Sequence, residues 1–70
     1  MTSTAPKFPQ VHVRRMDLID RPTYRVMSTV TDAMWHSDIP EPDMERYCAA
    51  VKDRESYDAI RITEDWITLT

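Results

Sequence analysis

Residues 24–31 read Tyr-Arg-Val-Met-Ser-Thr-Val-Thr, and the fold class depends on how this segment is interpreted. Valine and threonine are common in β-strands and less favourable in helices. The side chains also alternate between two sets, Tyr24, Val26, Ser28 and Val30 on one parity and Arg25, Met27, Thr29 and Thr31 on the other. A period of two places successive side chains on opposite faces of a sheet. We therefore predict a strand from Tyr24 to about Thr31.

A second strand is predicted before this one, from about Gln10 to Leu18. Val11 and Val13 share one parity there, whereas His12, Arg14 and Met16 share the other. The segment Asp20-Arg21-Pro22 lies between the two strands and is typical of a turn, because proline fixes φ and aspartate can bond its own backbone. The two strands are therefore expected to form an antiparallel hairpin.

An amphipathic helix is predicted to begin at Pro40-Glu41-Pro42 and to end near Arg54. Proline is tolerated in the first turn of a helix, and the helix dipole favours acidic residues there. Apolar side chains then recur at the spacing i, i+3, i+4, i+7, at Met44, Tyr47, Cys48 and Val51. This spacing predicts one apolar helix face that packs on a sheet.

The C-terminal residues 59–63 and 66–70 again have strand-like patterns, but their parity changes at Glu64-Asp65. We prefer one bulged strand, and two short strands joined by a tight turn are the alternative. The predicted fold class is α+β, in the order ββαβ, with a small antiparallel sheet covered on one face by a single helix. Residues 1–9 are expected to form a flexible N-terminal arm and residues 10–70 a single domain.

The composition excludes most familiar kinds of active site. The chain has 70 residues and no glycine, which removes the phosphate-binding loops, the dinucleotide fingerprint and the nucleophile elbow that depend on glycine. A chain this short cannot enclose a large substrate pocket, so we expect no enzymatic activity and no cofactor. Cys48, the only cysteine, lies on the predicted apolar helix face, where a nucleophilic partnership with His12 or His36 is disfavoured.

Five acidic residues follow one another without an intervening lysine or arginine: Asp32, Asp38, Glu41, Asp43 and Glu45. A solvated, capped helix start is one explanation of this run. A docking surface for a larger protein or nucleoprotein complex with a basic surface is the other, because fixed carboxylates can imitate a row of phosphates. Met34 and Trp35 would add the apolar and aromatic contacts that interface centres favour. The segment also contains His36, but its spacing matches no familiar metal loop, so no metal is expected.

A nucleic-acid-binding regulator is the alternative function. Arg14, Arg15, Arg21 and Arg25 would lie on or near the predicted hairpin, and paired strands can enter a DNA groove. The sequence pI of about 5.2 argues against this function, because nucleic-acid-binding domains are commonly basic. Met16 and Met27 share strand faces with arginines in this scheme, so a homodimer through an exposed sheet face is also expected.

In size, acidity, lack of glycine motifs and compact αβ pattern, the chain resembles the small inhibitors encoded by phages and mobile elements, anti-CRISPR proteins among them. The resemblance covers the general character of the whole chain and carries no individual residue across. It implies a protein-binding inhibitor that acts on host machinery in the host cell cytoplasm. A cytoplasmic location also follows from the lone thiol and the lack of a signal-peptide pattern, and the apolar runs are too short to predict a membrane partner.

Overall fold

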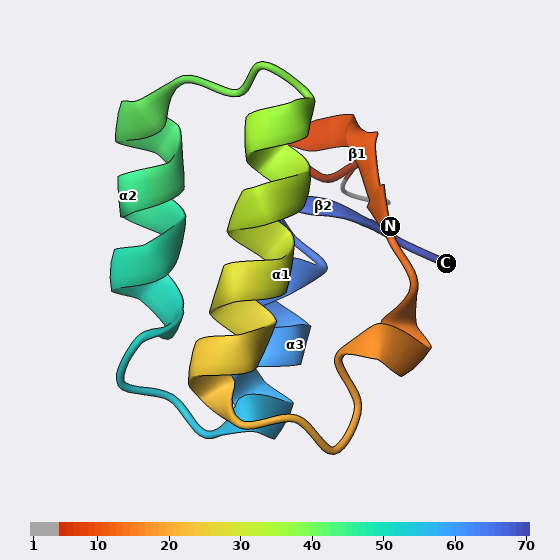
Figure 1. Cartoon of the computed structure of the whole chain (residues 1–70), viewed down its shortest axis with the longest axis vertical. Coiled ribbons are helices and arrows are strands. Elements are labelled where there is room, and N and C mark those ends of the chain that lie inside the picture. Colours follow the sequence, from red (N-terminus) through yellow and green to blue (C-terminus); the bar gives the residue numbers. More distant parts are fainter. Residues whose placement is uncertain (1–4) are drawn as a thin grey trace.

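The computed structural model describes residues 5–70, and its two strands are separated in the chain by three α-helices (Figure 1). The elements are β1 (Phe8–Val13), the short 3-10 helix η1 (Arg15–Asp17), α1 (Thr23–His36), α2 (Glu41–Val51), α3 (Ser56–Thr63) and β2 (Ile67–Leu69). The fold is α+β, as predicted. The predicted ββαβ order, with an antiparallel sheet and one helix, is wrong.

The segment that was predicted as the second strand lies inside α1. Val26, Val30 and Met34 are fully buried and recur every fourth residue, so they form one stripe of a helix that faces the interior. Pro22 is the N-cap residue, with φ −66° and an extended ψ of 160°, and it ends the preceding connection. The predicted hairpin therefore does not exist. Residues 32–36, which follow the predicted strand, form the last turns of the same helix.

The predicted first strand is present only in part. β1 begins at Phe8, before the predicted start at Gln10, and it ends at Val13. The remainder of the predicted strand forms η1 and then a turn, from which Leu18 enters the core. Phe8 and Pro9, which were assigned to the flexible arm, belong to β1; residues 1–4 of that arm lie outside the described residues.

The C-terminal region contains a helix and a short strand, where a bulged strand or two short strands were predicted. Residues 56–63 form α3, and Ala59 and Thr63 are its buried residues. β2 lies within the predicted strand 66–70, and it pairs with β1 in parallel, with Phe8 opposite Ile67 and Val13 opposite Leu69. Parallel strands need a long crossover connection, which the three helices provide.

The prediction of a helix after Pro40 is confirmed. α2 runs from Glu41 to Val51, with Pro42 in its first turn and two acids beside it. Met44, Tyr47 and Val51 are buried, and Cys48 is half-buried at the edge of the same face. The helix ends before the predicted Arg54.

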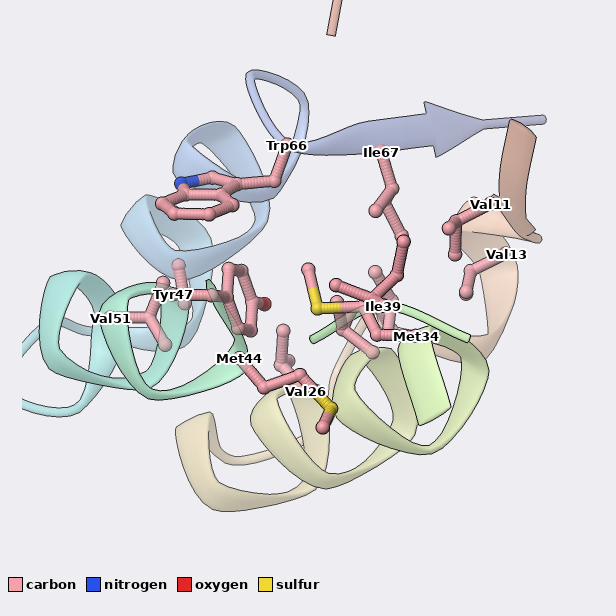
Figure 2. Close-up of a cluster of buried hydrophobic side chains, with 13 residues drawn as sticks. Val11, Val13, Val26, Met34, Ile39, Met44, Tyr47, Val51, Trp66 and Ile67 are labelled. Atoms are coloured by element: carbon pink, nitrogen blue, oxygen red, sulfur yellow. The ribbon is translucent and has the colours of Figure 1, made fainter. Parts of the chain in front are cut away.

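The core lies between α1, α2, α3 and the two-stranded sheet, and α1 is the central element because it contacts β1, α2 and α3 (Figure 2). The rings of Tyr47 and Trp66 pack edge to face there, with their centres 5.7 Å apart. The buried hydrophobic residues are Val11, Val13, Leu18, Val26, Val30, Met34, Ile39, Met44, Tyr47, Val51, Ala59, Trp66 and Ile67. Within residues 5–70, no helix has the length and apolar character needed to cross a membrane.

Candidate functional site

The predicted acidic residues gather where α1 ends and α2 begins. Asp32 and Trp35 belong to the last turns of α1, Asp38 to the connection, and Glu41, Asp43 and Glu45 to the first turns of α2. We call these six residues the acidic surface. All are exposed except Asp43, which is half-buried and accepts a 3.4 Å contact from the guanidinium of Arg46. Trp35 is 64% exposed, which is unusual for so large an apolar side chain.

Met34 was predicted to belong to this surface, and the structure places it elsewhere. Its side chain is fully buried in the core, on the same stripe of α1 as Val26 and Val30. Since consecutive helical residues point about 100° apart, Trp35 faces solvent when Met34 faces the interior. Met34 is therefore not part of the exposed acidic surface.

The connection between α1 and α2 has a tightly defined backbone. The N–H of Asp38 donates to the Trp35 carbonyl at 3.2 Å, and the N–H of Ile39 donates to the Met34 carbonyl at 3.1 Å. These bonds form the Schellman motif that commonly ends a helix, in which the residue at the position of Asp38 is usually glycine. Asp38 takes the required left-handed conformation with φ 61°. The acidic surface is therefore built on a fixed turn, although the chain has no glycine to form it.

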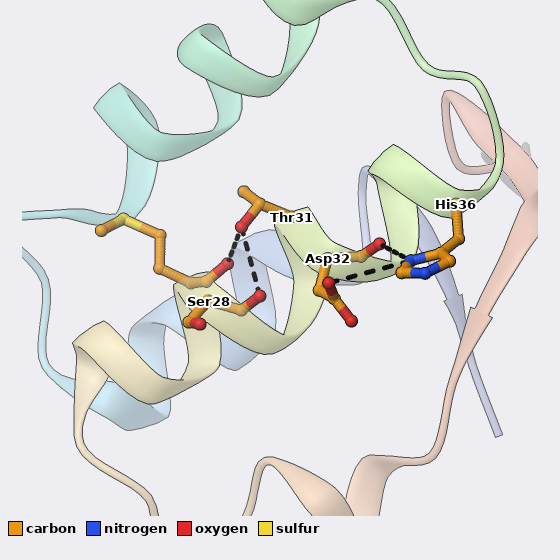
Figure 3. A network of polar contacts seen from close by, with 5 residues as sticks. Ser28, Thr31, Asp32 and His36 are labelled. Carbon is orange, nitrogen blue, oxygen red and sulfur yellow. Dashed lines mark hydrogen bonds and ion pairs between the residues drawn. The ribbon is translucent and has the colours of Figure 1, made fainter.

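His36 is the last residue of α1, beside the acidic surface (Figure 3). Its Nδ1 lies 2.8 Å from the backbone carbonyl oxygen of Asp32 and 3.8 Å from the Asp32 carboxylate. A carbonyl oxygen can only accept, so Nδ1 carries the proton in this contact. The imidazole therefore bonds back onto the preceding turn of α1, and the side chains of His36 and Asp32 both remain exposed.

The four arginines proposed for nucleic-acid binding do not share a pair of strands. Arg14 and Arg15 flank the start of η1, Arg21 lies in the following connection, and Arg25 lies in α1. Arg14 is 3.5 Å from the carboxylate of Asp17, and Arg15 is 2.6 Å from that of Glu64. The hairpin geometry on which this function was based is therefore wrong, and two of the four charges are engaged in ion pairs.

The exposed sheet face that was proposed for a homodimer does not exist, because residues 24–31 belong to α1. Met16 lies in η1 and is 66% exposed, whereas Met27 lies in α1 and packs against the core. These methionines cannot line one sheet face together. Self-association of the chain therefore stays a prediction, and no surface is assigned to it.

Cys48 has an environment that disfavours a nucleophilic thiolate. Burial raises the pKa of its thiol, and the negative charge of Glu45 raises it further. The thiol lies in a shallow groove between α1 and α2 with Thr31 and Met44. Within residues 5–70, no three histidine, cysteine or acidic side chains are arranged to hold a metal ion.

A cavity that was not predicted from the sequence lies beside α3. It has a volume of about 510 Å³, and residues of η1 and the following connection face residues of α3 across it. Tyr57, Ile60 and Arg61 of α3 and its C-cap residue Glu64 have the spacing i, i+3, i+4, i+7 of one helix face. That spacing is present in the sequence, but it indicates a shared face only in a helix, and residues 59–63 were predicted to form a strand.

No protein-family model, curated protein or solved structure matches this chain.

Proposed function

We propose that the protein is a non-enzymatic binding protein, an inhibitor in the manner of small phage proteins, that docks through the acidic surface on a larger partner with a basic surface. The partner is a protein or nucleoprotein complex that handles nucleic acid. The observation that carries the proposal is Trp35, which is 64% exposed in the last turn of α1, within the segment that carries the acidic run.

The position of these carboxylates favours docking over a capped helix start. Capping explains Glu41 and Asp43, because the N-terminal end of α2 attracts negative charge. It does not explain Asp32, which lies in the last turns of α1, where the helix dipole disfavours carboxylates. Residues that conflict with a local structural preference, as a carboxylate does at the C-terminal end of a helix, tend to occur at functional sites.

Trp35 supplies the contact that the charges alone would lack. Exposed charges mainly increase the rate of association and select the partner, whereas buried aromatic anchors provide most of the affinity at an interface. Trp35 is adjacent in sequence to a fully buried residue, so the helix fixes its direction. The acidic surface therefore combines a fixed aromatic anchor with the negative charge that would bring a basic partner to it.

Site-specific photo-crosslinking in the cells that naturally express the protein tests this function. One variant carries benzoylphenylalanine at position 35, and a control carries it at position 10, an exposed site on β1. We expect a discrete crosslinked product only from position 35, containing a basic nucleic-acid-handling protein identified by mass spectrometry. The same products from both positions, or none from position 35, would contradict the proposal.

A partner identified in this way is then tested with matched charge reversals. Asp38→Lys, Glu41→Lys and Glu45→Lys together should abolish the crosslink. Asp53→Lys, Glu55→Lys and Asp58→Lys change the net charge equally at exposed positions outside the acidic surface and should leave it intact. An equal loss in both triple variants would show that only net charge matters.

A further inference from the structure

The cavity beside α3 contains large apolar side chains that are left exposed. Ile19, from the connection after η1, is 48% exposed, and Tyr57, from the first turn of α3, is 72% exposed. Ile60 also belongs to the lining, and it is half-buried and packs against the core. Apolar side chains that converge on a hollow from distant parts of the chain form a surface that a ligand can cover with a gain in free energy.

Four charged side chains line this cavity, and only two of them form an ion pair. Arg15 and Glu64 form a 2.6 Å ion pair that ties η1 to the end of α3, so their charges largely neutralise each other and hold the cavity wall together. Arg61 is exposed and has no ion pair within the described residues. Asp20 lies in the lining as an exposed, solvated carboxylate. The cavity therefore contains one guanidinium that is available to an anion.

From this arrangement we propose that the cavity binds an apolar carboxylate. The carboxylate of the ligand accepts hydrogen bonds from Arg61, since a planar guanidinium matches the two oxygens of a carboxylate. Its aromatic or aliphatic body packs against Ile19, Tyr57 and Ile60, where aromatic rings stack at low cost in conformational entropy. A cavity of about 510 Å³ lies in the usual size range of small-ligand sites.

This site is separate from the acidic surface. The connection from α1 to α2 lies at one end of α1, whereas η1 and the start of α3 lie toward the other end (Figure 1). The ligand could be a free small acid or the C-terminal residue of a polypeptide, since both present the same chemistry. Binding here does not require the proposed partner, and either proposal can fail without the other.

The experiment titrates the ¹⁵N-labelled protein with two matched probes and follows the backbone amide signals of Tyr57, Ile60 and Arg61. N-acetyl-phenylalanine carries a free carboxylate, and N-acetyl-phenylalanine amide has the same body without the charge. We expect saturable shifts with the acid and at least about tenfold weaker binding of the amide, because a charged hydrogen bond contributes that much. Inorganic phosphate, which lacks an apolar body, should give no saturable shifts at these residues.

Single substitutions test whether Arg61 binds the carboxylate of the ligand and whether Tyr57 binds its apolar body. Arg61→Gln should weaken the acid at least about tenfold and leave the amide unchanged. Tyr57→Ser should weaken both probes, and Asp20→Asn should strengthen the acid because it removes a nearby negative charge. Arg46→Gln, at an exposed arginine of α2, is the matched control and should change nothing. All four positions are exposed, so the fold should survive each substitution.

A short peptide that ends in phenylalanine with a free carboxylate distinguishes the two sources. Tighter binding of the peptide than of N-acetyl-phenylalanine identifies a polypeptide C-terminus, and equal binding identifies a small acid. Equal affinities for the acid and the amide, no effect of Arg61→Gln, or no saturation by about 10 mM would overturn the proposal.

Discussion

The hydroxyl groups of Tyr47 and Thr63 lie 2.6 Å apart in the interior and connect α2 to α3. Thr63 also donates to the Ala59 carbonyl oxygen, at 2.7 Å. A hydroxyl has one proton, so Tyr47 is the donor in the bond between the two side chains. Thr63 is the only polar residue among the buried residues of the described chain, and this pairing satisfies it.

Replacing either partner should destabilise the protein by different amounts. Thr63→Val keeps the shape of the side chain but leaves the Tyr47 hydroxyl buried without an acceptor, which costs about 1–3 kcal/mol. Tyr47→Phe leaves Thr63 bonded to Ala59, so its cost is about 1 kcal/mol. Urea unfolding measures both free energies. A Thr63→Val cost no larger than that of Tyr47→Phe would contradict this donor assignment.

The same tyrosine makes stability depend on alkaline pH. Burial raises the pKa of Tyr47 from 10.0 to about 12. The fold holds the neutral phenol, so this stabilising contribution is fully present below about pH 10 and is lost as the pH rises toward 12. The free energy of unfolding should decrease by as much as about 1.4 kcal/mol per pH unit in this range.

A variant with one tyrosine allows that titration to be followed directly. Of the three tyrosines, Tyr24 and Tyr57 are exposed and can be replaced by phenylalanine, which leaves Tyr47 alone. Tyrosinate absorbance at 295 nm should then rise near pH 12 and coincide with loss of structure. Titration of the folded variant near pH 10 would show that the phenol is not desolvated.

Met34 and Trp35 are neighbours in the sequence and should respond oppositely to substitution by alanine. Met34→Ala creates a cavity in the core and should cost about 2–5 kcal/mol, a large part of the stability of a domain this size. Trp35→Ala removes an exposed side chain and should leave the melting temperature nearly unchanged while it abolishes binding of the partner crosslinked at position 35. Thermal melts and binding measurements on the two variants separate core from surface. A large stability loss in Trp35→Ala would place this side chain in the core.

Asp38 should show a conflict between stability and binding. Its left-handed backbone, with φ 61°, costs a non-glycine residue about 1–2 kcal/mol, and its charge opposes the dipole of α1. Asp38→Gly should therefore raise the free energy of unfolding by up to about 1 kcal/mol, after the greater backbone freedom of glycine in the unfolded chain is counted. The same variant should bind the partner more weakly. Unfolding curves and affinities of this variant, with Asp53→Gly as an exposed control, test both effects.

The helix after Pro40 was predictable because several local signals agree there. Proline and acids mark its start, and its apolar spacing fits no strand. Residues 24–31 were misassigned because Val26 and Val30 are four residues apart, and a separation of four fits a period of 2 as well as a period of 3.6. Met34 continues the spacing of four beyond the predicted end of the strand, and this was the one signal that favoured a helix.

The C-terminal region shows a different limit of local patterns. Ile60 and Ile62 have the alternation of a strand, yet Ala59 and Thr63, again four residues apart, are the buried positions of α3. The parallel pairing of β1 with β2 joins the two ends of the described chain, and no pattern within either strand encodes it. The exposure of most of the acidic residues was predictable from their charge. The cavity beside α3 was not predictable, because it forms only where η1 and α3 lie side by side.

The association rate constant of the partner crosslinked at position 35, measured against salt concentration, tests the proposed docking most directly. With Asp38, Glu41 and Glu45 changed to lysine, we predict association at least about tenfold slower at low salt and a nearly flat salt dependence. With Asp53, Glu55 and Asp58 changed to lysine, both the rate constant and its salt dependence should stay close to those of the unmodified protein. Equal slowing by the two triple variants, or an unchanged rate constant in the first, would contradict docking through the acidic surface.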